Sequence, residues 1–250
     1  MAEPRRASLF VPCLSEHFDV RAAEATARLL LHLGVALENP TGQTCCGQPF
    51  RTSGDLASAA ALARRMDKVF AHAEVVVTTS ASCASMVRTH YRSLPGLGAL
   101  SISTKVVELA EYLGHIGFDA TTVSWPGSAT YHPSCHGRDL HATPAPEPTL
   151  ALLAKVQGLT LVPLPTASQC CGFGGSFATR FAPISVALGE AKLASAGATG
   201  ATTLIANDAG CRLHLRGLPT PLEVKHLAEV LAEGLHLMPR PPRLPARASA

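Results

Sequence analysis

The sequence predicts an α/β protein built from two tandem, pseudo-repeated Rossmann-like units, each with a small, mostly parallel sheet flanked by helices. Three observations lead to this fold class: the cysteines recur in two matching sets, strand-like runs precede them, and amphipathic stretches lie between those runs. The chain has 250 residues, of which 47% are hydrophobic, so it is long enough and apolar enough for two cored units.

The eight cysteines are the clearest sign of duplication. In the first set, 31 residues separate the first cysteine from an adjacent pair, and 36 separate the pair from the last cysteine. In the second set the same two gaps are 34 and 39 residues. The offset between the sets drifts only from 122 to 125 to 128 residues. We therefore divide the chain into a first repeat, 1–125, and a second repeat, 126–238, followed by a segment at 239–250. The first set is Cys13, Cys45, Cys46 and Cys83, and the second is Cys135, Cys170, Cys171 and Cys211.

Strand-like runs lead into the outer cysteines of both sets. "SLFVPC" (8–13) and "ATYHPSC" (129–135) are short runs that end in a proline and a cysteine, while "EVVVTTSASC" (74–83) and "ATTLIANDAGC" (201–211) are β-branched runs that break into small polar residues. Ligands of parallel sheets gather at the carboxyl ends of the strands, so the outer cysteines are expected there. We expect the seam near 121–130, with Pro126–Gly127 as a breaker.

Three apolar stripes at helical spacing predict helices between the strands. Arg180 and Lys192 are expected on solvent-facing sides of helices. The stripes are Val20, Ala23, Ala27, Leu30 and Leu31; Leu56, Ala60, Ala63, Val69 and Phe70; and Val224, Leu227, Ala228, Leu231 and Leu235.

The charge pattern excludes some partners. The net charge of +3 equals the three arginines of the last twelve residues, and the rest of the chain has 18 basic and 18 acidic residues. A neutral body argues against nucleic acid as a partner. The Pro-rich segment 239–250 is predicted to be disordered. No secretory signal and no membrane span is visible, so we expect a cytoplasmic protein, in which cysteines bind metal or react rather than form structural disulfides.

Four thiolates at one sheet edge select zinc or an iron–sulfur cluster. A structural zinc site normally uses short cysteine knuckles, whereas each set here draws on three distant segments, which favours a cluster over zinc or a redox disulfide. We expect each set of four to converge on its own metal site. Glycines after the pairs let the backbone approach and point N–H groups at sulfide, so Gly47, Gly172, Gly174 and Gly175 are predicted to wrap the cofactor.

The sequence resembles the cysteine-rich CCG-domain family of iron–sulfur oxidoreductases, in its lactate utilization protein A branch. The resemblance spans about residues 8–234 and is carried by "VPC", "GQTCCGQP", "SASCASMVRTHY", "YHPSCH", "CCGFGGSFATRFAPIS", "NDAGCRLHLRG" and "VKHLAEVL". It implies an electron-transfer subunit of a three-protein system that oxidises L-lactate to pyruvate. The implied partners are a separate subunit with ferredoxin-type cysteine motifs and a third lactate-utilization subunit.

One departure from the family bears on the cofactor. Relatives often end each repeat in CxxC, which gives five cysteines, whereas this chain has Ser80 and Asp208 at the first of those positions. Four thiolates per repeat suit an ordinary [4Fe–4S] cluster, up to one per repeat, and cast doubt on the five-thiolate, non-cubane type. A Ser80 or Asp208 oxygen remains a candidate ligand.

The remaining polar residues assign no catalytic group. His132 and His136 flank Cys135 as candidate ligands or proton donors, although a hydrogen-bonded histidine that packs the loop is the simpler interpretation. "GFGG" lacks the third glycine of a dinucleotide fingerprint, which argues against nicotinamide or flavin. Because the second pair is richer in glycine, we expect the second repeat to hold the redox-active centre, and the first to be more structural, with zinc as an alternative.

Overall fold

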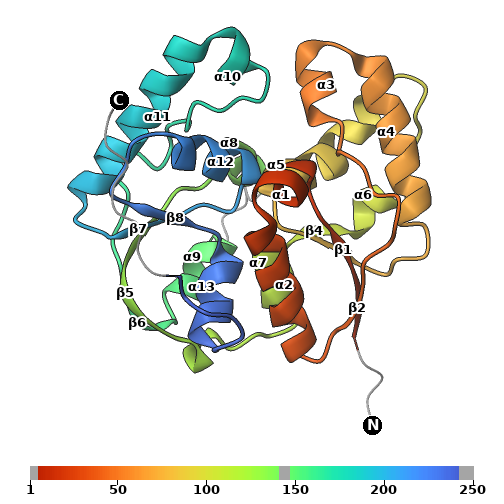
Figure 1. The fold of residues 1–250 in the computed structure, drawn as a ribbon. Helices are drawn as coiled ribbons and strands as arrows, with labels where there is room; N and C mark the ends of the chain where they lie inside the picture. Colours follow the sequence, from red (N-terminus) through yellow and green to blue (C-terminus); the bar gives the residue numbers. More distant parts are fainter. Residues whose placement is uncertain (1–4, 141–146, 242–250) are drawn as a thin grey trace.

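The computed structural model describes residues 5–140 and 147–241, and within them it contains two sheets of four parallel strands (Figure 1). The two sheets share one topology, because strand order β2-β1-β3-β4 in the first matches β6-β5-β7-β8 in the second. The predicted fold class, a duplicated parallel α/β architecture, is confirmed. The strands are β1 (Arg6–Phe10), β2 (Ala36–Glu38), β3 (Val76–Thr78), β4 (Val106–Glu108), β5 (Ser124–Tyr131), β6 (Gln157–Leu161), β7 (Thr203–Ile205) and β8 (Glu223–Lys225).

The helices repeat in the same order, except that α6 has no counterpart in the second half. A π-helical turn at Met86–His90 continues α5, and 3-10 turns lie at Tyr91–Ser93 and Ala120–Thr122. The first half contains α1 (Cys13–Phe18), α2 (Val20–His32), α3 (Gln48–Ser53), α4 (Leu56–Val69), α5 (Ala81–Ser85), α6 (Ile102–Lys105) and α7 (Leu109–His115). The second contains α8 (Cys135–Leu140), α9 (Pro148–Leu153), α10 (Phe177–Arg180), α11 (Ala182–Ala198), α12 (Ala209–Gly217) and α13 (Leu227–Gly234).

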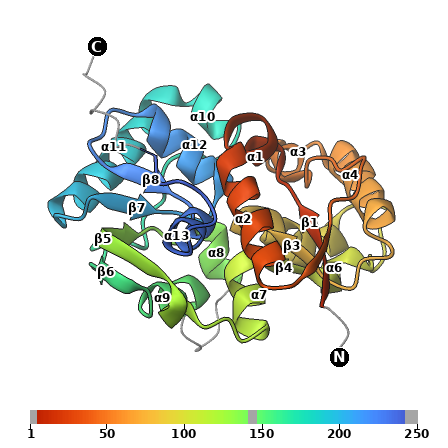
Figure 2. The same cartoon turned by 60° about the horizontal axis from the view of Figure 1, so that its bottom comes forward.

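The two halves pack through reciprocal helix contacts. Helix α13 lies against α2, and α7 against α9, while α5 meets α8 and α1 meets α12 near the sheet edges (Figures 1 and 2). The α2–α13 contact is apolar, since Leu29 and Leu30 share a buried cluster with Leu227 and Leu231. This arrangement brings the carboxyl ends of both central strands, β1 and β5, towards the seam.

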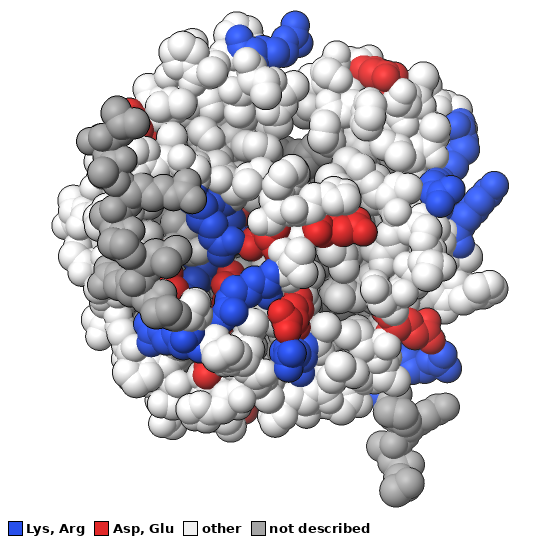
Figure 3. Space-filling view, viewed as in Figure 1, with Lys and Arg blue, Asp and Glu red and all other residues white. Residues whose placement is uncertain are grey.

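A buried network of charges also crosses the interface between the two halves, which is called the seam below. Asp19, between α1 and α2, contacts the guanidinium groups of Arg212 and Arg216 from α12, at 2.6 and 2.5 Å. Arg21 of α2 forms ion pairs with Glu229 and Glu233 of α13, at 3.1 and 2.9 Å. In the space-filling view, acidic and basic side chains gather where the halves meet, and the face over α3, α10 and α11 carries few charges (Figure 3). In the described part of the chain, no helix is both long and apolar enough to cross a membrane.

Several sequence predictions about individual residues were wrong. In α2, Val20 and Leu31 are 58% and 59% exposed, because the face that meets α13 is turned towards Ala25 and Leu29. In α4, Leu56 is 42% exposed. Val224 does not begin the last helix, because it lies in strand β8, where it pairs with Leu204.

Pro126–Gly127, expected as a breaker, and Lys192 also differ from expectation. Pro126 and Gly127 do not break the chain: they lie inside β5, at a shift in its register with β6. Lys192 is fully buried, and its ammonium group donates to the Thr166 carbonyl instead of facing solvent. Of the predicted tail, 239–241 are described, and Arg240 stacks 3.9 Å from the Trp125 ring centroid. The rest of the tail, 242–250, lies outside the described residues.

Candidate metal centre

Each set of thiols comes from three segments that follow consecutive strands of one sheet. Cys13 opens α1 after β1, and Cys83 lies in α5 after β3; the pair Cys45–Cys46 occupies the turn between β2 and α3. Because β1 and β3 are parallel, with Phe10 opposite Thr78, the chain leaves both strands at the same edge. The second repeat places Cys135, the second pair and Cys211 in the same way after β5, β6 and β7.

In the first repeat the thiols form a chain of contacts. Cys45 interacts with Cys13 and Cys46, and these contacts lower the pKa of the Cys45 thiol to about 3. Cys46 in turn interacts with Cys45 and Cys83, which raises its own pKa, as does its burial. The Gly47 peptide N–H lies 3.4 Å from the Cys45 sulfur as donor. These contacts and the Gly47 N–H favour the anionic form of the Cys45 sulfur.

The second repeat reproduces this pattern. Contacts with Cys135 and Cys171 lower the pKa of Cys170 to about 2, and the Gly172 N–H donates to its sulfur at 3.3 Å. Cys171 lies 3.0 Å from Cys211, sulfur to sulfur. The structure thus groups the thiols by repeat, although whether they ligate metal stays a prediction. All eight cysteines are free thiols.

The glycines of both turns hold left-handed backbone conformations. Gly47 and Gly172 have φ of +86° and +93°, and in the second turn Gly174 and Gly175 follow at +53° and +64°. A side chain at Gly172 would lie 2.4 Å from the Ser185 carbonyl oxygen, so this turn passes directly against α11. Only glycine gives both the turn and the N–H contact to sulfur.

Both thiol groups face a single cavity of about 360 Å³, which all eight cysteines line. Gln48, just after the first glycine turn, donates to the His136 ring of the second repeat at 2.9 Å, and both also line this cavity. His136 therefore links the two repeats. A cofactor held by one group would face the same cavity as a cofactor held by the other.

Ser80 and Asp208, the candidate oxygen ligands, bond to each other across the seam. The Ser80 hydroxyl and the Ser82 N–H both donate to one Asp208 oxygen at 3.0 Å. The other Asp208 oxygen caps α12, where it accepts from the N–H groups of Gly210 and Cys211. Burial raises the pKa of Asp208, but these bonds, led by those from Ser82, lower it overall. Both residues therefore join the repeats, and the Asp208 oxygens are already committed.

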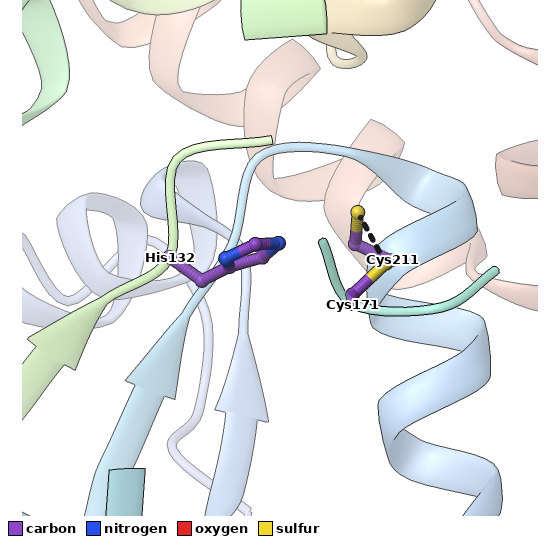
Figure 4. Close-up of side chains that lie close together, drawn as sticks. All are labelled: His132, Cys171 and Cys211. Atoms are coloured by element: carbon purple, nitrogen blue, oxygen red, sulfur yellow. Dashed lines mark hydrogen bonds between the residues drawn. The ribbon is translucent and has the colours of Figure 1, made fainter. Parts of the chain in front are cut away.

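His132 is the site residue that sequence reasoning undervalued. It is fully buried, and neither ring nitrogen has a hydrogen-bond partner among the described residues, so it is not the hydrogen-bonded loop histidine of the simpler interpretation. Its ring lies beside Cys171 and Cys211, with all three ligand atoms within 4.8 Å of one another (Figure 4). Burial and the charge of Lys192 lower the pKa of His132 to about 4, so the imidazole is neutral. The sequence feature that could have identified His132 is its position: it precedes Cys135 by three residues, as Phe10 precedes Cys13 in the first repeat.

Charge distinguishes the two groups as well. The pKa values of Cys13, Cys45 and Cys46 respond to other thiols, burial and peptide N–H groups. In the second repeat, the positive charge of Arg138 additionally lowers the pKa of Cys135, which the Cys170 contact and burial otherwise raise. Burial lowers the pKa of Lys192, and the nearby sulfurs of Cys171 and Cys135 act in the opposite direction. The second group is thus the one with basic side chains nearby.

The fold and the site define a duplicated parallel α/β protein with two four-thiol groups of the kind that bind a thiolate-ligated metal centre. The family model described as "Cysteine-rich domain" (CCG) matches residues 7–88 and 129–216, one match in each repeat. The chain belongs to this family, in its lactate utilization protein A branch.

Relatives match along nearly their whole length. "Lactate utilization protein A" of Geobacillus kaustophilus (strain HTA426) is 40% identical, over 90% of this chain and 98% of that protein. "Lactate utilization protein A 2" of Bacillus cereus (strain AH820) is 37% identical, over 92% and 99%. Among solved structures, an aspartate racemase homologue from Pyrococcus horikoshii OT3 covers 94% of this chain and 98% of its own, but its TM-score of 0.32 and identity of 10% carry no argument.

Proposed function

We propose that this chain is the iron–sulfur redox subunit of a multi-protein system that oxidises L-lactate to pyruvate. One observation carries the proposal: four thiols from each repeat converge, and both groups line the same cavity. The names of the relatives supply the metabolic context. In this proposal the chain works in the cytoplasm with a ferredoxin-type iron–sulfur subunit and a third lactate-utilization subunit. The eight free cysteines suit that reducing compartment.

The donor set fits an iron–sulfur centre. In the first repeat Cys13, Cys45, Cys46 and Cys83 would hold it, and in the second Cys135, Cys170, Cys171 and Cys211. Such a centre, when bound, takes up and releases single electrons. The chain supplies soft thiolate ligands, and buried surroundings that limit water around Cys46, Cys83, Cys171 and Cys211.

The backbone of the two turns has a separate task. The Gly47 and Gly172 N–H groups donate to the first sulfur of each pair and favour its anionic form. They therefore stabilise negative charge at the site without a charged side chain. Because both thiol groups line one cavity, centres held there would face each other across it, which supports the proposed transfer of electrons between the two halves.

Metal analysis of the protein purified without air tests this proposal. We expect brown protein that contains iron and acid-labile sulfide, with iron content halved when the four cysteines of one repeat are replaced by serine. The matched control is the equivalent replacement in the other repeat. Colourless protein with stoichiometric zinc and no sulfide would instead support a zinc-bearing structural or assembly subunit. Iron-free protein whose thiols cycle with a disulfide would support a heterodisulfide-reductase-like role.

A further inference from the structure

The two repeats differ at a position that lies near the thiols of its own repeat in each case. Phe10 and His132 each precede the first cysteine of their set by three residues, at the end of β1 and directly after β5. Phe10 belongs to a buried apolar cluster that includes Cys46 and Cys83. His132 lies beside Cys171 and Cys211, which are the equivalent cysteines of the second repeat (Figure 4).

An imidazole is costly at this place unless something binds it. Both nitrogens of His132 are buried without a partner among the described residues, and an unpaired buried polar group destabilises the fold. A phenylalanine fills the matching position of the first repeat with no such penalty, and its ring contacts Phe70 edge-on with centroids 6.0 Å apart. The histidine therefore requires an explanation that packing does not provide.

The surroundings of His132 indicate what it binds. Its neighbours are the sulfur atoms of Cys171 and Cys211, which lie within 4.8 Å of a ring nitrogen. Thiolate and neutral imidazole are both ligands of zinc and of iron. The other candidate in this repeat, Asp208, already accepts four hydrogen bonds.

We propose that His132 is a nitrogen ligand of the metal centre held by the second repeat, so that this centre has mixed nitrogen and sulfur ligation and the first has sulfur ligation only. Ligation satisfies one of the two unpaired ring nitrogens. The inference rests on the proposed function only in taking the thiols as metal ligands. It places the nitrogen donor in the second repeat, whereas the sequence analysis named the first repeat as the alternative location for zinc.

Cobalt(II) added to the metal-free, full-length chain under argon tests the donor set itself. With ¹⁵N-labelled histidine, electron–nuclear double resonance on the bound cobalt should detect one directly coupled histidine nitrogen. His132→Phe, which copies the first repeat, should remove that coupling and weaken one cobalt equivalent by about tenfold or more. The second cobalt equivalent should keep its affinity.

Two controls separate ligation from packing. His136→Gln alters the other histidine beside Cys135, whose ring bonds to Gln48, and should leave the nitrogen coupling intact. Phe10→Leu disturbs the matching position of the first repeat and should do the same. If His132→Phe fails to fold, His132→Gln retains a polar side chain and should still lose the imidazole coupling.

The outcomes are distinct from those of the iron–sulfur test. Histidine coupling that persists in a folded His132→Phe variant, or that is absent from the unmutated chain, would overturn the ligand assignment. Absence of iron and sulfide from protein purified without air would instead reject the iron–sulfur function. In that case the cobalt result would still decide whether His132 is a ligand.

Discussion

The two repeats share one backbone plan but surround their thiols differently. Both place a cysteine pair in a glycine turn. Both also contain an arginine five residues after the last cysteine, which forms an ion pair with the third residue of the next long helix. These pairs are Arg88 with Glu111, and Arg216 with Glu229. Only the second adds His132 and the buried Lys192 near its thiols. The two repeats thus share the arrangement of their thiols but differ in the side chains that surround them.

The sharpest test of this difference replaces one cysteine in each pair. Because basic side chains near the second group stabilise a more reduced centre, we expect Cys171→Ser to abolish lactate-dependent electron transfer in the assembled system. Cys46→Ser should cause a milder loss, or mainly a lower yield of folded protein. The measurement is turnover per folded chain. Equal loss in two well-folded variants would show that the repeats are not specialised.

A second test compares two arginines that follow the last cysteine of the second and first sets. Arg212 is fully buried, contacts Asp19 at 2.6 Å and donates to the Ala206 carbonyl. Arg212→Met should lower the free energy of unfolding by roughly 3 kcal/mol, since buried charges lose compensation. Arg88, 33% exposed in its pair with Glu111, should cost less than about 1 kcal/mol when changed to Met. Denaturant unfolding measures both, and similar losses would contradict the distinction.

A third test uses the residues that cap α7 and α13. Burial, and the charges of Glu147 and Glu111, raise the pKa of Glu108 from 4.5 to about 8. Its stabilising contribution is therefore complete below pH 4.5 and is lost as the pH rises through 8, a fall of roughly 5 kcal/mol at 1.36 kcal/mol per pKa unit. Glu108→Gln should flatten unfolding free energy across this window. A variant whose pH profile matches that of the unmutated protein would refute the assignment.

The matching cap of the second repeat predicts the opposite slope. His226 accepts the Ala228 N–H at Nδ1 and donates from Nε2 to the Thr79 carbonyl, and burial, followed by the charge of Arg212, lowers its pKa well below 6.5. The folded chain then loses stability as the pH falls below 6.5, where the unfolded chain binds the proton. His226→Gln should reduce that acid-side loss in the same unfolding series.

The smallest expected difference concerns the glycine turns. An alanine Cβ at Gly172 would lie 2.4 Å from the Ser185 oxygen, whereas at Gly47 the nearest atom, the Ala59 oxygen, is 3.3 Å away. Gly172→Ala should lower the free energy of unfolding by about 2–3 kcal/mol and Gly47→Ala by about 1–2 kcal/mol. Thermal and denaturant unfolding of the metal-free chains compares them. A larger loss at Gly47 would reverse the order.

The spacing of the cysteines was sufficient to predict the duplication and the convergence of each set. The carboxyl ends of parallel strands lie at one edge of a sheet. Residues that follow β1 and β3 therefore lie close together at that edge, because the intervening helix returns the chain to the opposite edge. The β-branched runs before Cys83 and Cys211 predicted strands β3 and β7. The glycines after each pair predicted a close approach of the backbone to the thiols, and their positive φ angles are the conformation that allows it.

The seam between the repeats could not be derived in this way. The Asp208–Ser80 bond and the exposure of Val20 depend on which helix faces pack together, and the periodicity of one helix does not specify its partner. Local sequence therefore determined the ligand frame, which requires only strand direction and turn geometry. Tertiary packing decided that the two thiol groups share one cavity and that His132 lies buried and unpaired beside Cys171 and Cys211, since both facts arise from contacts between segments far apart in the chain.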